Sequence, residues 1–370
     1  MKKTNSYFFI GLALFSMFFG SGNLIFPLYI GQIAQENFLS ATLGFLLTAV
    51  AFPFFGVLAM IVYKGDYSAF FSCLGKRTGT LLTALLLTAW VPLGSGPRCI
   101  VLAYASSTTY LNLPPLWVWS LFSCILIAVI AYKKSRMLDF LGYILTPLLL
   151  LCLCIIILQG LWDPSFSSSS YSNGELFFEG LKEGYNTMDL IAAFFFSASI
   201  IDLLRKTNTD NPIKLSLKSC SVGVLLLGIV YFFLIALSAA YSQSLEGIPK
   251  EQLLAQIAKI VLGSKMGIIA MVTIILACFT TLLALTSVYT DFLMNTLFYK
   301  HPKSKQLSLF TTLLSTFIFS TLGLKGITFI TAPILQVFYP LLIVLIVINV
   351  GKKLLKTSSL SNSLVSPENT

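Results

Sequence analysis

Apolar runs long enough to cross a lipid bilayer recur along the whole chain, and they limit the possible folds more than any other feature. A transmembrane helix needs about 20 predominantly apolar residues, and ten such runs are present. They cover approximately residues 7–30, 39–63, 81–104, 116–132, 137–158, 184–204, 219–241, 266–294, 307–322 and 327–350. The sequence therefore predicts an all-α polytopic membrane protein with ten transmembrane helices.

Composition and charge support this interpretation and argue against several other classes of protein. Of the 370 residues, 56% are hydrophobic and 10% are charged, and the mean hydropathy is +0.88, unlike a soluble globular domain. Lys and Arg outnumber Asp and Glu by 24 to 14, but they lie in short loops without a contiguous patch, so nucleic acid is not a predicted partner. No nucleophile and base pair, metal-ligand set or phosphate loop is recognisable, so we predict neither an enzyme nor an organic cofactor.

The distribution of Lys and Arg between alternate loops predicts the topology. Eighteen of them fall on the side of the N-terminus and five on the other side. Because cytoplasmic loops carry the excess of positive charge, we expect both termini to lie in the cytoplasm. If one membrane-spanning run had been missed, the Lys and Arg residues beyond it would be assigned to the wrong side. The clear alternation therefore also supports the count of ten runs.

A Ser-rich stretch, FSSSSYSNG, divides the chain into two halves. We interpret residues 161–183 as an extracytoplasmic linker between a first five-helix repeat, residues 1–160, and a second repeat, residues 184–352. A polar cytoplasmic tail follows over 353–370. Because five is odd, the two repeats would enter the membrane from opposite sides, which is the arrangement of transporters built from inverted repeats.

The first apolar run is interrupted at its middle by Gly20, Ser21, Gly22 and Asn23, in the stretch FFGSGNLIFP that ends at Pro27. We predict that the helix breaks there, because irregular backbone at membrane depth marks a binding site or cavity. The four residues are therefore candidate substrate ligands. The alternative is that the glycines only allow close helix packing.

A broken helix offers free N–H groups at the start of its second half and free carbonyls at the end of its first half. The N–H groups suit a carboxylate and the carbonyls suit a cation. We therefore expect a substrate carboxylate on the amides of Ser21 and Gly22, and the carbonyls near Ser16 and Phe19 to face an ion.

The sixth run has small polar residues at the same depth, in FFFSASII. Ser197 lies as far into its run as Gly20 does, so we predict a second break near Ser197, with Phe196, Ser197 and Ser199 in the substrate site. The neighbours of both breaks are aromatic and uncharged, which predicts an apolar substrate side chain.

In the eighth run, Ala277, Thr280 and Thr281 share one helical face through their i, i+3, i+4 spacing. Two hydroxyls and a carbonyl are hard oxygen ligands that fit Na⁺ better than a transition metal. The alternative is that the threonines bond to their own backbone or to a neighbouring helix.

Two charges within apolar runs are further candidates, because charge inside a membrane is costly. Arg98 lies in the outer part of the third run and Asp189 near the outer end of the sixth. We expect them to face one outer vestibule as a gating pair. The alternative is that each side chain extends to the membrane interface.

Three stretches, FFGSGNLIFP, GYNTMDLIAAFFF and TAPILQVFYPLLIVL, resemble the bacterial branched-chain amino acid carrier family. The resemblance implies a sodium- or cation-coupled symporter of leucine, isoleucine and valine in the bacterial inner membrane, with the five-plus-five inverted-repeat fold. It also implies a sodium site formed by Ala277, Thr280 and Thr281 with the carbonyls of Ser16 and Phe19. The family usually has glycine where Ser197 stands, and two further spans after the tenth, which we do not expect here.

Together these features predict a secondary transporter that imports branched-chain amino acids with Na⁺ by alternating access. Its expected partners are the amino acid and the lipid bilayer, and the sequence makes no prediction of oligomeric state. Proton coupling is the first alternative, and it would depend on Asp189. An ion channel would need a polar lining that is not recognisable, and a transport-inactive scaffold or sensor of the same fold is the remaining alternative.

Overall fold

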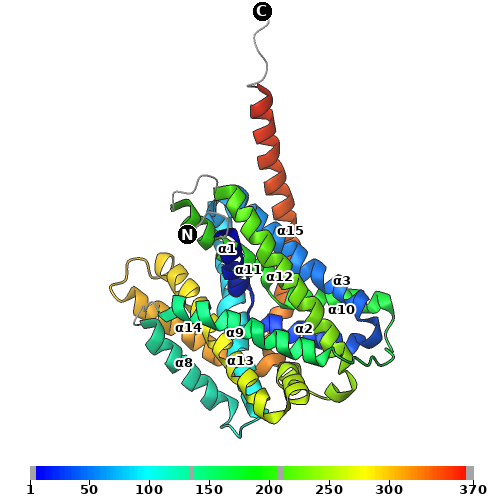
Figure 1. The fold of residues 1–370 in the computed structure, drawn as a ribbon. Helices are drawn as coiled ribbons and strands as arrows, with labels where there is room; N and C mark the ends of the chain where they lie inside the picture. The colour runs from blue at the N-terminus through cyan, green and yellow to red at the C-terminus, as the bar shows by residue number, and fades with distance from the viewer. Residues whose placement is uncertain (1–5, 133–136, 207–211, 364–370) are drawn as a thin grey trace, which may run out of the picture.

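A computed structural model describes residues 6–132, 137–206 and 212–363, and every regular element in these ranges is a helix (Figure 1). The prediction of an all-α protein is therefore confirmed. The helices are α1 (Ser6–Phe18), α2 (Ser21–Ala34), α3 (Phe38–Leu46), α4 (Phe52–Val62), α5 (Tyr67–Phe71), α6 (Lys76–Trp90), α7 (Gly96–Thr108), α8 (Leu116–Tyr132), α9 (Met137–Gly160), α10 (Asn173–Asn186), α11 (Asp189–Lys206), α12 (Pro212–Ala240), α13 (Leu253–Asn295), α14 (Ser304–Ser320) and α15 (Gly323–Ser363).

Short non-α turns connect several of these helices. Two are π-helical, at Leu47–Ala51 between α3 and α4 and at Val91–Ser95 between α6 and α7. Four are 3-10 helices, at Gln35–Asn37, Ser72–Leu74, Gln243–Leu245 and Lys250–Gln252.

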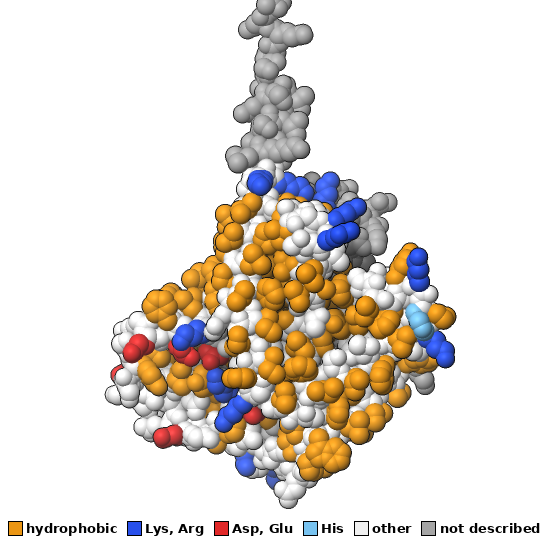
Figure 2. Space-filling view, turned by 180° about the vertical axis from the view of Figure 1, so that it is seen from behind, with side chains coloured by type: hydrophobic (Ala, Val, Ile, Leu, Met, Phe, Trp, Pro, Cys, Tyr) orange, Lys and Arg blue, Asp and Glu red, His pale blue; other side chains and the backbone are white. Residues whose placement is uncertain are grey.

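Each of the ten predicted runs lies mainly on helical structure, with interruptions at residues 19–20 and 187–188. Five helical segments are long and apolar enough to cross a membrane, and they cover Ser21–Val62, Lys76–Thr108, Leu215–Ala240, Lys250–Asn295 and Gly323–Lys353. Figure 2 shows hydrophobic side chains over much of the visible face, while Lys and Arg side chains lie toward its margins. A broad apolar surface of this kind is typical of a membrane protein.

The stretch interpreted as a linker, residues 161–183, contains the start of a helix. Helix α10 begins at Asn173, inside the proposed linker, and continues to Asn186. Its start is stabilised by a capping box, in which the Ser172 hydroxyl accepts from the backbone of Glu175 and the Glu175 carboxylate accepts from the backbone of Ser172. Residue 184, where the sequence interpretation begins its second repeat, lies within this helix.

Helices α3 and α10 pack with their backbones in close contact. The missing side chain of Gly44 leaves room for the carbonyl of Phe177, and that of Gly180 leaves room for the carbonyl of Ala41. Small residues allow such approach between helices in a membrane. This contact fixes α10 against the first half of the chain and so positions the helix end that contributes to the site.

Candidate functional site

The first interruption lies where the sequence predicts it. Helix α1 ends at Phe18 and α2 starts at Ser21, while Gly20 between them has an extended backbone. The amide of Phe19 still bonds to the carbonyl of Phe15 at 2.8 Å, so the break is confined to the next residue. Ser21, Gly22 and Asn23 are buried in the first turn of α2, where backbone N–H groups lack partners within the helix.

The second interruption is displaced from its predicted position. Helix α10 ends at Asn186 and α11 starts at Asp189, and between them Met188 has a φ of 65°. A positive φ is uncommon for a residue other than glycine and ends the helix there.

The prediction of a break near Ser197 is wrong. Ser197 lies inside the continuous helix α11, and its hydroxyl donates to the carbonyl of Ala193 one turn earlier. Serine can satisfy its hydroxyl in this way without breaking a helix, so equal depth in an apolar run was a misleading criterion. The side chain of Ser199 lies outside the described residues. Thr187 followed by Asp189 resembles a helix start, and this signal could have located the break.

The two interruptions adjoin each other through Gly22 and Asn23. A Cβ atom on Gly22 would lie 3.1 Å from the carbonyl oxygen of Thr187. The Asn23 amide nitrogen is 3.2 Å and 3.3 Å from the two carboxylate oxygens of Asp189 and 3.2 Å from the carbonyl of Phe18. Its amide oxygen accepts from the backbone of Gly20 at 3.3 Å. One side chain therefore contacts both halves of the first broken helix and the start of α11.

Tyr231 on α12 completes this polar cluster. Its hydroxyl donates to Asp189 at 2.5 Å and also accepts from the Asn23 amide. Both Asp189 and Tyr231 are buried, at 2% and 0% exposure. A buried carboxylate needs such donors, because an unpaired charge in an apolar environment is unfavourable. The side chain of Asp189 thus lies at the junction of the two breaks.

Arg98 contacts the same junction from the other side. Its guanidinium donates to the carbonyl of Asn186, the last residue of α10, and to the hydroxyl of Thr331 at 3.0 Å. Its exposure is 0%, which excludes the alternative that it extends to the membrane interface. No ion pair joins Arg98 to Asp189 in the described part of the chain, so each charge has its own partners.

One of the predicted ion ligands, Thr281, lies beside the first break. A Cβ atom on Gly20 would be 3.5 Å from the Cγ2 atom of Thr281, so α13 meets the interruption at this threonine. Thr280 donates to the carbonyl of Ala277 at 2.9 Å, which is the alternative expected for a threonine in a membrane helix. Its oxygen can still act as an acceptor.

The backbone around the first break supplies carbonyls to the same region. Phe19 is buried with its ring 4.9 Å from that of Phe15, while Ser16 lies in the last turns of α1, where carbonyls lack helical donors. The described residues contain no cluster of three His, Cys, Asp or Glu side chains that could hold a metal. The predicted ion ligands at this position are carbonyl and hydroxyl oxygens.

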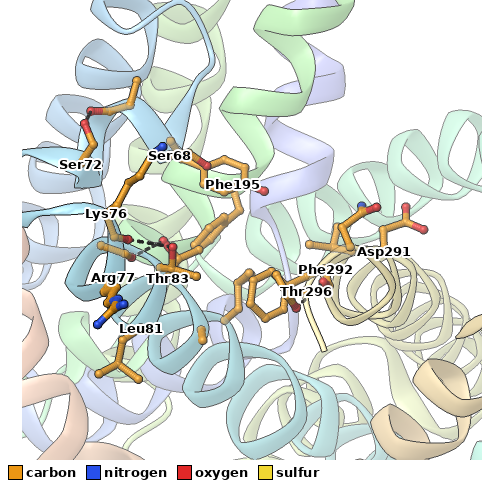
Figure 3. A pocket seen from close by; sticks show the side chains of 18 residues that line it. Ser68, Ser72, Lys76, Arg77, Leu81, Thr83, Phe195, Asp291, Phe292 and Thr296 are labelled. Atoms are coloured by element: carbon orange, nitrogen blue, oxygen red, sulfur yellow. Dashed lines mark hydrogen bonds between the residues drawn. The ribbon is translucent and has the colours of Figure 1, made fainter. Parts of the chain in front are cut away.

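A cavity of about 1190 Å³ opens at the side of the predicted inner loops (Figure 3). Helices α5, α6, α11 and α13 line it, with Lys76 and Thr83 on one side and Asp291 and Phe292 on the other. Phe195 of α11 forms part of its wall. The sequence interpretation did not identify this cavity, because its walls come from helices that are distant in the chain.

Aromatic rings of α5, α6 and α11 pack together beside this cavity. The ring centroid of Phe195 lies 5.4 Å from that of Tyr67 and 5.9 Å from that of Trp90. The rings of Phe196 and Trp90 meet edge-on, with their centroids 5.0 Å apart. Phe196, a predicted substrate residue, is therefore part of an aromatic group that includes Trp90 of α6.

Charged residues connect the helices near the end of α10. Lys250 forms an ion pair of 2.9 Å with Glu183 of α10 and lies 3.3 Å from the ring centroid of Tyr29 on α2. Glu183 also accepts from the side chain of Asn186 at 3.1 Å. These contacts connect the segment that carries Lys250, which the sequence predicts to be an outer loop, to both interrupted helices. The sequence interpretation missed them.

Comparison with known proteins identifies the family. Residues 3–366 match the family model of branched-chain amino acid transport proteins. The chain belongs to this family. It is a multi-pass membrane transporter and not an enzyme. Among curated relatives, the branched-chain amino acid permease BraB of Bacillus subtilis is 29% identical over 362 residues, which cover 94% of this chain and 80% of the permease.

Solved structures share the fold of this family member. The inward-facing conformation of Mhp1 aligns with a TM-score of 0.58 and 17% identity, covering 88% of this chain and 73% of Mhp1. The substrate-bound outward-open state of a Na⁺-coupled sialic acid symporter aligns with a TM-score of 0.51 and 13% identity. The alignment covers 86% of this chain and 72% of the symporter. The chain therefore shares its overall helical fold with these two structures.

Proposed function

We propose that this protein imports leucine, isoleucine and valine across a bacterial inner membrane by Na⁺ symport with alternating access. In this proposal α1 with α2 is the first span and α10 with α11 the sixth span of ten, arranged as two inverted five-helix repeats with both termini in the cytoplasm. The observation that carries the proposal is the meeting of two interrupted helices at Asn23 and Asp189. Transporters of this kind bind substrate and ion where such helices are discontinuous.

The substrate would bind at the start of α2, with its carboxylate on the amides of Ser21 and Gly22. These N–H groups are in the first turn of a helix and at the positive end of its dipole. The apolar side chain would lie toward the aromatic residues of α11, among them Phe196. Ser197 is one residue further along α11, and its bond to Ala193 leaves its oxygen able to accept a second hydrogen bond.

The Na⁺ ion would bind between α1 and α13. Its ligands would be the carbonyls of Ser16, Phe19 and Ala277 and the hydroxyls of Thr280 and Thr281. The short distance between Gly20 and Thr281 supports this placement, and an all-oxygen set without a carboxylate suits a monovalent hard cation.

Alternating access is supported by the difference between the two sides of the site. The cavity lined by Lys76 and Phe195 opens toward the predicted cytoplasm, whereas the ion pair between Lys250 and Glu183 closes the other side. We interpret this arrangement as an inward-facing state. The reverse arrangement would admit substrate from outside.

Proton coupling is the second candidate, and the position of Asp189 favours it. Asp189 is a buried carboxylate at the junction of both breaks, which is where a proton-coupling group would be needed. The two candidates differ in their dependence on Na⁺.

Uptake of radiolabelled leucine into proteoliposomes, with and without a Na⁺ gradient, tests the proposal. Accumulation that requires the gradient is the expected result. Accumulation driven by a pH gradient without Na⁺ would support the proton-coupled alternative. Absence of uptake of any neutral amino acid would contradict transport and support a scaffold or sensor.

A further inference from the structure

Arg98 carries a buried positive charge that this structure does not neutralise. Its side chain has 0% exposure, and its hydrogen-bond acceptors are the neutral oxygens of Asn186 and Thr331. The Nε atom has no hydrogen-bond partner. The Phe26 ring, 5.0 Å from the guanidinium carbon, offers a cation–π contact but no full charge.

The nearby carboxylates are engaged elsewhere. Glu183 pairs with Lys250 and accepts from Asn186, and Asp189 accepts from Asn23 and Tyr231. No carboxylate of the described residues forms an ion pair with Arg98. A buried charge without a counter-charge is strongly unfavourable, so this position is suited to an anion that arrives from outside the chain.

Arg98 lies beside both interruptions. The next residue, Cys99, contacts Ser21 at the start of α2 with its sulfur 3.5 Å from the serine hydroxyl. The guanidinium itself reaches the end of α10. The π-helical turn Val91–Ser95 precedes α7, and Gly94 in this turn packs against Met188 of the second break. Such π-helical turns occur frequently at functional sites.

We propose that Arg98 is the counter-charge of the substrate, donating from its Nε atom to the carboxylate that also binds the amides of Ser21 and Gly22. This inference rests on the proposed function and assigns it a specificity-determining residue. It explains why an arginine is kept at a buried position next to both breaks. It also predicts selection for amino acids over the corresponding amines and alcohols, because only a carboxylate compensates the guanidinium.

Binding of leucine and leucinol to purified protein in lipid nanodiscs tests this assignment. Leucinol keeps the amine and the branched side chain but has a hydroxymethyl group in place of the carboxylate. We expect Arg98→Gln to reduce the ratio of leucine to leucinol affinity at least about 30-fold, the usual consequence of removing one partner of a buried charge pair. The affinity for leucinol should be unchanged.

Two controls separate this role from a structural one. Thr331→Val removes a hydrogen bond of Arg98 but keeps the charge, so the ratio should stay at its wild-type value. Lys325→Gln removes an exposed positive charge on α15 and should also leave the ratio unchanged. If Arg98→Gln does not give folded protein, Arg98→Lys replaces it; lysine lacks the planar fork of donors, and a loss of about 10-fold in the ratio is then expected.

The outcomes distinguish this inference from the proposed function. Loss of the leucine preference in the Arg98 variant alone supports the inference. Equal loss of leucine and leucinol binding, or an unchanged ratio, overturns it while leaving the proposed function intact. Failure of the wild-type protein to bind leucine with Na⁺ or protons present would overturn both.

Discussion

The side-chain amide of Asn23 donates to the carboxylate of Asp189 and thereby joins the starts of α2 and α11, which are the second halves of the two interrupted helices. Tyr231 of α12 bonds to both side chains. Because these groups are buried, a change at one of them must alter the others. The two breaks are therefore joined by one buried hydrogen-bond network.

Replacement of Asp189 distinguishes the two candidate coupling ions. Asp189→Asn keeps a side chain that can accept from Tyr231 but removes the titratable group. If Na⁺ drives transport, leucine uptake in proteoliposomes should retain its dependence on a Na⁺ gradient, even if its rate falls. Uptake that becomes independent of any ion gradient, with exchange of leucine preserved, would instead assign the coupling to this carboxylate.

Removal of the threonine hydroxyls should weaken coupling to Na⁺. We expect Thr281→Val to raise the Na⁺ concentration for half-maximal leucine uptake at least about 10-fold, since an ion ligand is lost without a change in volume. Thr286→Val on the same helix is the matched control, because Thr286 bonds to the carbonyl of Leu282 within α13. Equal effects of the two variants would contradict the Na⁺ site between α1 and α13.

Loss of the outer ion pair should favour opening on that side. In Lys250→Met the contacts to Glu183 and Tyr29 are lost. A membrane-impermeant thiol reagent applied to intact cells should then modify Cys99, which is buried in this structure, about 5-fold faster, as expected for a shift of about 1 kcal/mol. Mass spectrometry of the Cys99 peptide measures the rate.

Lys259→Met is the control for this experiment. Lys259 is an exposed lysine in the same outer region and lies 5.9 Å from the ring of Tyr110. The variant should leave the modification rate of Cys99 unchanged. A rate in Lys250→Met that equals the wild-type rate would contradict the interpretation of this ion pair as an outer closure.

The glycine contact between α3 and α10 should be sensitive to one added methyl group. A Cβ atom on Gly180 would collide with the carbonyl of Ala41 and lie 3.0 Å from the amide of Phe45. We expect Gly180→Ala to reduce the free energy of unfolding by about 1–3 kcal/mol, seen as a lower thermal midpoint in detergent. Gly174→Ala on the same helix, with no atom within 4 Å of its added Cβ, should not lower the midpoint.

Local composition was sufficient to predict the helical segments and the first break. The apolar runs have the length of membrane helices, and Gly20 with Pro27 places a helix-breaking signal in the middle of one of them. The spacing of Thr280 and Thr281 predicted a polar face, and the structure brings Thr281 to that break. Each of these features depends on residues close together in the chain.

The second break and the partners of the charges were decided by the tertiary structure. A serine at membrane depth can remain helical, as Ser197 does, so depth alone could not locate the break. Sequence also paired Arg98 with Asp189 because both are charges in apolar runs. In the folded chain Asp189 bonds to Asn23 of α2 and Tyr231 of α12, whereas Arg98 bonds to the end of α10. The physical reason is that a buried charge takes its partners from whichever helices pack around it, and that packing is set by contacts between segments far apart in the sequence.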